Sequence, residues 1–151
     1  MGKQVQPGEM NAVTDYSALI DGAGINVCKL LLDDELTILW ANDNFYISSG
    51  FGKDEYQTLF HHIKAYYTGH GDEFAKIKNA FYDVLQKGER RVKVGCRRPL
   101  KDNTCAWINI DGIITGEIVD SKPVALAVYS DISDVAKLKA ERDQLLEEKT
   151  R

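Results

Sequence analysis

The 151-residue sequence lacks a long apolar run, and this excludes a membrane span. No stretch approaches the roughly 20 consecutive apolar residues that a transmembrane helix requires. The N-terminal segment MGKQVQPGEMNAV also has no apolar core of the kind that a secretory signal peptide needs. We therefore expect a cytoplasmic chain without direct membrane contact, and any anchor of a parent protein would lie outside it.

Cysteine and histidine are few and are poorly spaced for metal binding. The three cysteines, Cys28, Cys96 and Cys105, form no C-x-x-C pair. An odd number of cysteines without a secretion signal favours reduced thiols. The three histidines lie between residues 61 and 70, without partner cysteines or the HExxH spacing of a zinc site. No metal site is expected.

Catalytic motifs are absent as well, because the chain has no nucleophile elbow, no P-loop and no paired histidine–carboxylate motif. The run GHGDEF at residues 69–74 contains most of a nucleotide-cyclase signature. A cyclase needs that signature on a hairpin, whereas here it leads directly into the helical pattern FAKIKNAFYDVLQ. We therefore expect that this chain is not an enzyme.

An excess of positive charge is also missing, since the formal net charge is −4. This balance gives no indication of nucleic-acid binding. A basic cluster does occur, and it alternates with apolar residues along a predicted strand; its members are Arg90, Arg91, Lys93, Arg97 and Arg98. We interpret the cluster as a solvated sheet face.

What the sequence does contain is the pattern of a small α+β domain. Two β-rich runs, one starting at Ile25 and the other spanning Leu36 to Ala41, flank an acidic turn and predict a hairpin. Capping residues and paired glycines at 42–60 predict short helical turns. A longer amphipathic helix is predicted from its N-cap, Asp72, to Gln86.

Three further strands are predicted at residues 89–98, 104–117 and 122–132, with GEIVDSK as the loop between the last two. The register of the first two strands stays open. A two-residue loop at Asp102–Asn103 would place Trp107 on the face of Val92, whereas a bulge near Pro99 would reverse that parity. The expected fold is a five-stranded antiparallel sheet with helices on one face.

Four motifs, in this order along the chain, resemble the PAS family of sensory domains. They are DDELTILWANDNFYISSGF, HGDEF, LKDNTCAWINI and YSDIS, and the resemblance covers about residues 14–150. The sequence departs from the family pattern at Gly71, which replaces a proline, and at Asn103, which replaces a turn glycine. The resemblance implies a leader at 1–13, a PAS domain at 14–132 that begins with a short helix, and a signalling helix at 133–151.

The implied function is that of a sensory module in a bacterial signal-transduction protein, of the two-component or cyclic-di-GMP type. Such a module binds a small ligand or a partner and controls an output domain of the same polypeptide, either a histidine kinase or a diguanylate cyclase. The alternative is a dimerisation or protein-interaction domain without a ligand. Candidate pocket residues are aromatic or amide side chains of the helical middle and the closing strands: Phe45, Tyr46, Tyr56, Phe60, Tyr66, Trp107, Asn109 and Tyr129. For any one of them, a place in the hydrophobic core is the plainer interpretation.

No cofactor is expected. Flavin-binding members of the family carry a cysteine in a motif of the N-C-R-F-L type, and the matching region after Gly52 has none. A haem ligand would require a histidine on or close to the long helix, and His70 just before it is interpreted as a hydrogen-bonded surface group. The identity of a small-molecule ligand stays open.

The C-terminal segment predicts a charged helix with a narrow apolar seam. Val135, Leu138, Arg142 and Leu145 are spaced by three, four and three residues, which is the a/d pattern of a coiled coil with Arg142 as its weak position. We therefore expect a parallel homodimer. Signal transmission is assigned to the junction and the seam: Asp131, Ile132, Ser133, Val135, Leu138, Arg142 and Leu145.

Overall fold

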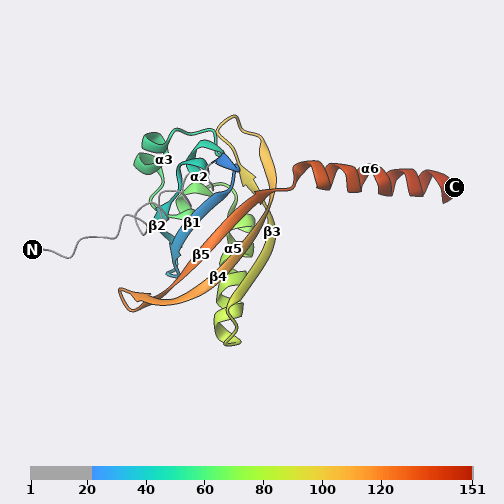
Figure 1. Cartoon of the computed structure of the whole chain (residues 1–151). Coiled ribbons are helices and arrows are strands. Elements are labelled where there is room, and N and C mark those ends of the chain that lie inside the picture. The colour runs from blue at the N-terminus through green and yellow to red at the C-terminus, as the bar shows by residue number, and fades with distance from the viewer. Residues whose placement is uncertain (1–21, 151) are drawn as a thin grey trace, which may run out of the picture.

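In the computed structural model, the chain is described from residue 22 to residue 150, with the side chains of 135–137 and 148–150 left out. A single antiparallel sheet is covered on one face by helices, and a last helix projects away from the domain (Figure 1). The leader at 1–13 and the helix expected from Thr14 lie outside the described residues.

The sheet has the strand order β2-β1-β5-β4-β3, and every neighbouring pair is antiparallel. Its strands are β1 (Asn26–Leu31), β2 (Thr37–Ala41), β3 (Arg91–Pro99), β4 (Cys105–Val119) and β5 (Lys122–Asp131). The predicted hairpin forms because the carboxylate of Asp33 accepts hydrogen bonds from the backbone N–H and the hydroxyl of Thr37, at 3.0 and 2.6 Å. The predicted five-stranded α+β architecture is confirmed.

The helices that cover the sheet come from the middle of the sequence, and the projecting helix comes from its end (Figure 1). The covering helices are α2 (Asp43–Ile47), α3 (Lys53–Leu59), α4 (Ile63–Tyr66) and α5 (Gly71–Gln86). The projecting helix is α6 (Ser133–Thr150). Asn42 fixes the position of α2, because its side-chain oxygen accepts hydrogen bonds from the N–H groups of Phe45 and of Val27 on β1. The helical segment between β2 and β3 is therefore attached to the sheet by hydrogen bonds at its first helix, α2.

Helix α5 packs its apolar face on the sheet and begins two residues earlier than predicted. His70 is its N-cap, so the prediction of Asp72 as the cap is wrong; Asp72 instead lies in the first turn, where its charge favours the helix dipole. Gly88, with a φ of +70°, follows the C-cap. A buried Phe81 lies directly under Gly112 of β4, where a Cβ would come within 2.9 Å of the ring.

The β3–β4 register settles which side chains of β4 share a face with Val92 of β3. Pro99 pairs with Cys105 and Arg97 pairs with Trp107, which leaves a five-residue loop, Leu100–Thr104, instead of a two-residue turn. Trp107 and Asn109 therefore face away from the helices. The predicted loop GEIVDSK is also wrong: β4 continues to Val119, and a two-residue turn with positive φ at both residues leads into β5.

Candidate functional site

An aromatic cluster lies between the sheet and helices α2 to α4. Six of the eight predicted pocket residues form it: Phe45, Tyr46, Tyr56, Phe60, Tyr66 and Tyr129. Five come from the helical middle and Tyr129 comes from β5. Most neighbouring rings meet edge to face, with centroids 5.1–5.7 Å apart, and each such pair contributes about 0.5–1.5 kcal/mol beyond its buried area.

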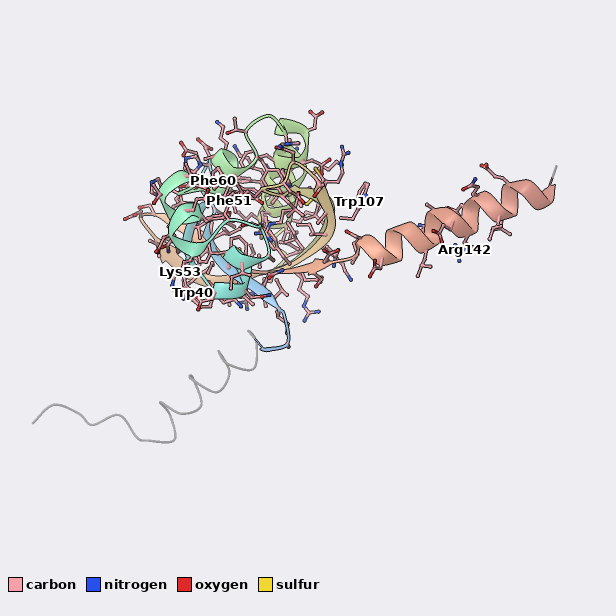
Figure 2. All side chains as sticks on the ribbon, turned by 90° about the horizontal axis from the view of Figure 1, so that it is seen from above. Trp40, Phe51, Lys53, Phe60, Trp107 and Arg142 are labelled. Atoms are coloured by element: carbon pink, nitrogen blue, oxygen red, sulfur yellow. The ribbon has the colours of Figure 1, made fainter. Side chains whose placement is uncertain are left out.

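The remaining two predicted pocket residues do not belong to this cluster. Trp107 is 45% exposed, and Asn109 lies on the same outer face, where its side chain bonds Asp111. Figure 2 shows Trp107 on the side from which α6 leaves, well away from Phe51 and Phe60. Their assignment to the pocket is wrong, because the observed register, which the sequence left open, turns both side chains to the outer face.

Arg98 lies among the rings of this cluster, so the prediction that it belongs to a solvated sheet face is wrong. The residue is only 3% exposed, whereas Arg91, Lys93 and Arg97 do face solvent. The alternation along β3 does predict that Arg98 is buried, because it lies an even number of residues from the buried Val92 and Cys96 and so shares their face. The arginine was missed because charged side chains are almost always exposed.

The guanidinium of Arg98 contacts only neutral groups. It donates to the hydroxyl of Ser48 at 2.7 Å and to the carbonyl of Phe45 at 2.8 Å. Its central carbon lies 4.8, 5.6 and 5.3 Å from the ring centroids of Phe45, Tyr66 and Tyr129. Within the described part of the chain no carboxylate forms an ion pair with it. A buried positive charge is therefore stabilised by π-faces and dipoles.

Burial controls the ionisation of the groups around Arg98. Burial raises the pKa of the Cys28 thiol to about 12, although the positive charge of Arg98 acts in the opposite direction. The pKa values of Tyr67 and Tyr129 are raised well above the ordinary range, and burial is again the largest cause. Both tyrosines thus stay neutral, and their buried hydroxyls make no hydrogen bond of normal geometry in the described structure.

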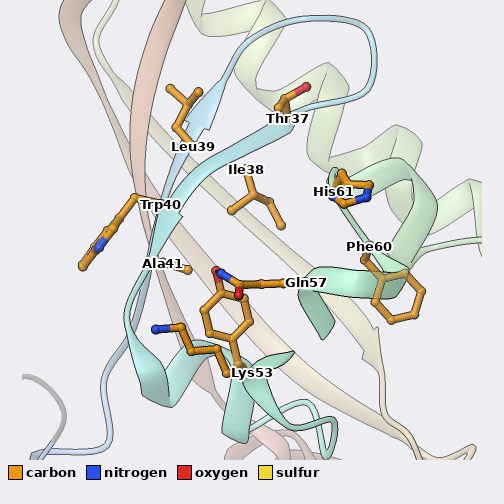
Figure 3. Close-up of a pocket in the computed structure, with 10 residues that line it drawn as sticks. Thr37, Ile38, Leu39, Trp40, Ala41, Lys53, Gln57, Phe60 and His61 are labelled. Carbon is orange, nitrogen blue, oxygen red and sulfur yellow. The ribbon is translucent and has the colours of Figure 1, made fainter. Parts of the chain in front are cut away.

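A groove of about 550 Å³ opens on the surface between edge strand β2 and helix α3 (Figure 3). Ile38, Gln57 and Lys53 project into it, while Trp40 points to the other side of β2. The Tyr46 hydroxyl, at the back of the groove, accepts a long hydrogen bond of 3.4 Å from Gln57. Since Tyr46 also packs on Phe45 and Tyr56, the groove borders the aromatic cluster directly.

The junction between β5 and α6 is held by hydrogen bonds to β4. Ile132 donates its N–H to the carbonyl of Trp107 at 2.8 Å, and the Ser133 hydroxyl accepts from the N–H of Trp107 at 3.0 Å. The Asp131 carboxylate accepts from the N–H of Ser133 at 2.8 Å. The three predicted junction residues are therefore brought together, and Trp107 belongs with them.

Beyond the junction, α6 exposes its predicted seam. Leu138 and Leu145 are 65% and 58% exposed. Arg142 makes an ion pair of 3.8 Å with Asp143 and stands out from the helix (Figure 2). The side chain of Val135 lies outside the described residues. Helix α6 makes its main contact with the domain at β4, and Figure 1 shows the helix projecting away from the sheet.

A second connection to the junction, missed in the sequence, starts at Glu73 in the first turn of α5. Its buried carboxylate accepts the backbone N–H of Arg97 at 2.7 Å and lies 3.5 Å from the Arg97 guanidinium. The same guanidinium lies 5.7 Å from the ring centroid of Trp107. Helix α5 is thus linked around the edge of the sheet to the residue that holds α6.

The described residues contain neither a metal-binding cluster nor a membrane-spanning helix. No group of three histidine, cysteine or acidic side chains in this range is placed to hold a metal ion. No helix in this range combines the length and the apolar character that crossing a bilayer requires.

No protein-family model and no curated protein matches the chain. Solved structures do match: a sensory box histidine kinase/response regulator from Burkholderia thailandensis is 16% identical over 87% of this chain and 98% of that one, with a TM-score of 0.63. An RNA-binding light-oxygen-voltage receptor is 13% identical over 99% of this chain and 42% of its own, with a TM-score of 0.65. The PAS domain of an HTR-like protein from Haloarcula marismortui is 15% identical over 82% and 93%, with a TM-score of 0.57. The chain therefore has the PAS fold, as its four motifs predict.

Proposed function

We propose that this chain is the sensory module of a bacterial signal-transduction protein. It binds a small molecule in the aromatic interior and transmits the signal through α6 to an output domain, a histidine kinase or a diguanylate cyclase. The PAS fold and the likeness to a sensory box histidine kinase/response regulator and to a light-oxygen-voltage receptor support a sensory role. The module itself is non-catalytic and acts in the cytoplasm.

The main support for the proposal is that strand β5 belongs both to the aromatic cluster and to the junction with α6. Tyr129 lies in the aromatic cluster, with its ring 5.2 Å from that of Phe45. Only two residues later, Asp131 begins the junction that holds α6. A ligand that moves the Tyr129 ring therefore acts on the end of the strand from which α6 starts, and packed strands and helices transmit such shifts as discrete rearrangements.

The exposed seam of α6 supports a homodimer. Leu138 and Leu145 project from a charged helix that leaves the domain, and a parallel partner helix would cover them. In such a pair both α6 helices run toward their output domains. Arg142 in the seam weakens the packing, so the coiled coil can be switched by a small displacement at its start.

The proposed ligand is a small molecule, and neither flavin nor haem fits the groups near the interior. All three cysteines lie on strands, Cys28 on β1, Cys96 on β3 and Cys105 on β4, whereas the helical region has none. His70 caps α5 at an exposed position. The absorption spectrum of the purified chain tests this point.

Native mass spectrometry of the purified chain tests the proposal itself. We expect a dimer that carries a bound small molecule, and a Leu138→Ser, Leu145→Ser variant that is monomeric but keeps the bound mass. A dimer without any bound mass in every preparation would favour the alternative, a dimerisation domain without a ligand. A monomer without bound mass contradicts the proposal.

A further inference from the structure

We infer that the interior ligand is a small monocarboxylate whose carboxylate pairs with Arg98. This inference rests on the proposed function, because it names the chemistry of the molecule that the interior would bind. It depends on three features of the cluster: an uncompensated charge, two unused hydroxyls and a surrounding of aromatic rings.

The first feature is the charge. Arg98 is always ionised, is 3% exposed, and contacts only the Ser48 hydroxyl, the Phe45 carbonyl and aromatic groups. Buried charges are normally paired, because an unpaired ion in a medium of low dielectric constant is strongly disfavoured. Among the described side chains, no carboxylate forms an ion pair with this guanidinium. An anion from solution would supply the missing partner.

The second feature is the pair of unused donors. The hydroxyls of Tyr67 and Tyr129 are buried without a hydrogen bond of normal geometry, and each lies beside a thiol, Cys96 for Tyr67 and Cys28 for Tyr129. The ring of Tyr129 lies 5.3 Å from the Arg98 guanidinium carbon, and the ring of Tyr67 lies 5.6 Å from that of Tyr66, which also contacts Arg98. Tyr129 contacts the fixed cation and Tyr67 contacts the next ring of the cluster, and neutral hydroxyl donors together with a guanidinium are the groups that an oxyanion acceptor binds.

The charge balance selects a monocarboxylate over a phosphate. A carboxylate neutralises the single positive charge of Arg98, and its planar geometry matches the guanidinium. A phosphate dianion would leave one negative charge among aromatic rings, which is costly in such surroundings. The rings of Phe45, Tyr56 and Tyr66 offer edges and faces to an apolar or aromatic body.

A surface hollow at the end of α2 borders a residue that contacts Arg98. A hollow of about 490 Å³ is lined by Ser48, Ser49 and Lys101. Ser48 accepts the hydrogen bond from Arg98, so only this side chain and its neighbours separate the hollow from the guanidinium. Lys101 adds a positive charge at the entrance, which attracts an anion.

The test is isothermal titration of the purified chain, unfolded in urea, dialysed and refolded to release bound molecules, with sodium benzoate. Sodium phosphate, sodium chloride and neutral benzamide serve as comparison ligands at matched ionic strength. We expect saturable one-to-one binding of benzoate, weakened at least about 100-fold in Arg98→Gln, because a charged pair is lost. The matched control is Arg91→Gln, which removes an exposed arginine from the same strand and should leave binding unchanged.

A second variant covers the case in which Arg98→Gln fails to fold. Tyr129→Phe removes a hydroxyl that makes no hydrogen bond of normal geometry and lies beside the Cys28 thiol, so the unliganded variant should be about as stable as the wild type. Its affinity for benzoate should fall about tenfold, as expected for a hydrogen bond to a charged group. Saturable binding of benzamide but not of benzoate would overturn the carboxylate inference, but it would still support a ligand site in the interior. Tighter binding of phosphate than of benzoate would also overturn it. Binding of none of the probes, with no bound mass in the purified chain, would contradict both proposals.

Discussion

The hydroxyl of Ser133 accepts a hydrogen bond from the backbone N–H of Trp107 at 3.0 Å, so the first residue of α6 is held by the neighbouring strand β4. The N–H of Ser133 is bonded in turn by the Asp131 carboxylate. The start of the projecting helix is thereby fixed to two strands of the sheet, one of which carries Tyr129. In the proposed function, a displacement of either strand changes the direction of α6.

Removing the Ser133 hydroxyl should loosen the start of α6. We expect Ser133→Ala to lower the local stability of the first turn by about 1 kcal/mol, the usual effect of losing a helix-start hydrogen bond. Hydrogen–deuterium exchange of the first α6 turns should become about fivefold faster. The control is Ser130→Ala, which changes an exposed serine on β5; equal effects of the two changes would show that the Ser133–Trp107 bond is not what holds the helix.

The placement of Phe45 inside and Trp107 outside is tested by a pair of alanine variants. Phe45 is 0% exposed, so Phe45→Ala should lower the free energy of unfolding by about 3–5 kcal/mol. Trp107 is 45% exposed, so Trp107→Ala should lower it by less than about 1 kcal/mol. Urea denaturation measures both. Similar losses in the two variants would contradict the β3–β4 register.

Gly112 and Gly71 form a second matched pair. At Gly112 a Cβ would lie 2.9 Å from the Phe81 ring and 3.3 Å from the Leu126 carbonyl, so Gly112→Ala should cost about 1–3 kcal/mol of stability by overpacking. At Gly71, in the first turn of α5, a Cβ meets nothing within 4 Å. Gly71→Ala should therefore leave the melting temperature unchanged or raise it, because alanine favours a helix. A destabilised Gly71→Ala with a tolerant Gly112→Ala would reverse the expected order and exclude the observed α5 packing.

Glu73 should make stability depend on pH in the acid range. Burial acts to raise its pKa, but the hydrogen bonds from Arg97 and Lys76 and their charges outweigh burial and hold it below 4.5. The folded state therefore favours the ionised form, and this contribution is complete above pH 4.5 and is lost as the pH falls through the lower folded pKa. We expect the wild type to lose more stability than Glu73→Gln on acidification. Glu89→Gln, at an exposed position, should follow the wild type. Parallel curves for Glu73→Gln and the wild type would mean that the carboxylate is not preferentially ionised in the fold.

The fold was predictable because local chemistry marks its elements. The acidic turn before β2 and Gly88 after α5 have side chains or backbone angles that specify where the chain reverses or a helix ends. The β3–β4 register was not predictable in the same way. Whether the chain turns in two residues or in the five of Leu100–Thr104 depends on contacts such as that of Lys101 with Ser49, which no local pattern contains.

The candidate site was predictable in part. Five of the six clustered aromatic residues lie in the helical segment, where large apolar side chains above a sheet have to be buried, and the sixth, Tyr129, lies on the closing strand β5. Trp107 and Asn109 were misplaced because a shift of one residue reverses every side chain on a strand. Arg98 and the Glu73–Arg97 contact were missed because the first contradicts the usual exposure of arginine and the second joins residues far apart in sequence.

The central claim, that the aromatic interior communicates with α6, is tested most directly by hydrogen–deuterium exchange. The chain as purified is compared with the same chain after unfolding in urea, dialysis and refolding, which releases a bound small molecule. The account predicts that release changes the exchange rates of α2 to α4, around Phe45 and Tyr66, and also those of the first turns of α6 after Ser133. A change confined to α2 to α4, with identical exchange at Ser133 and beyond, would contradict it.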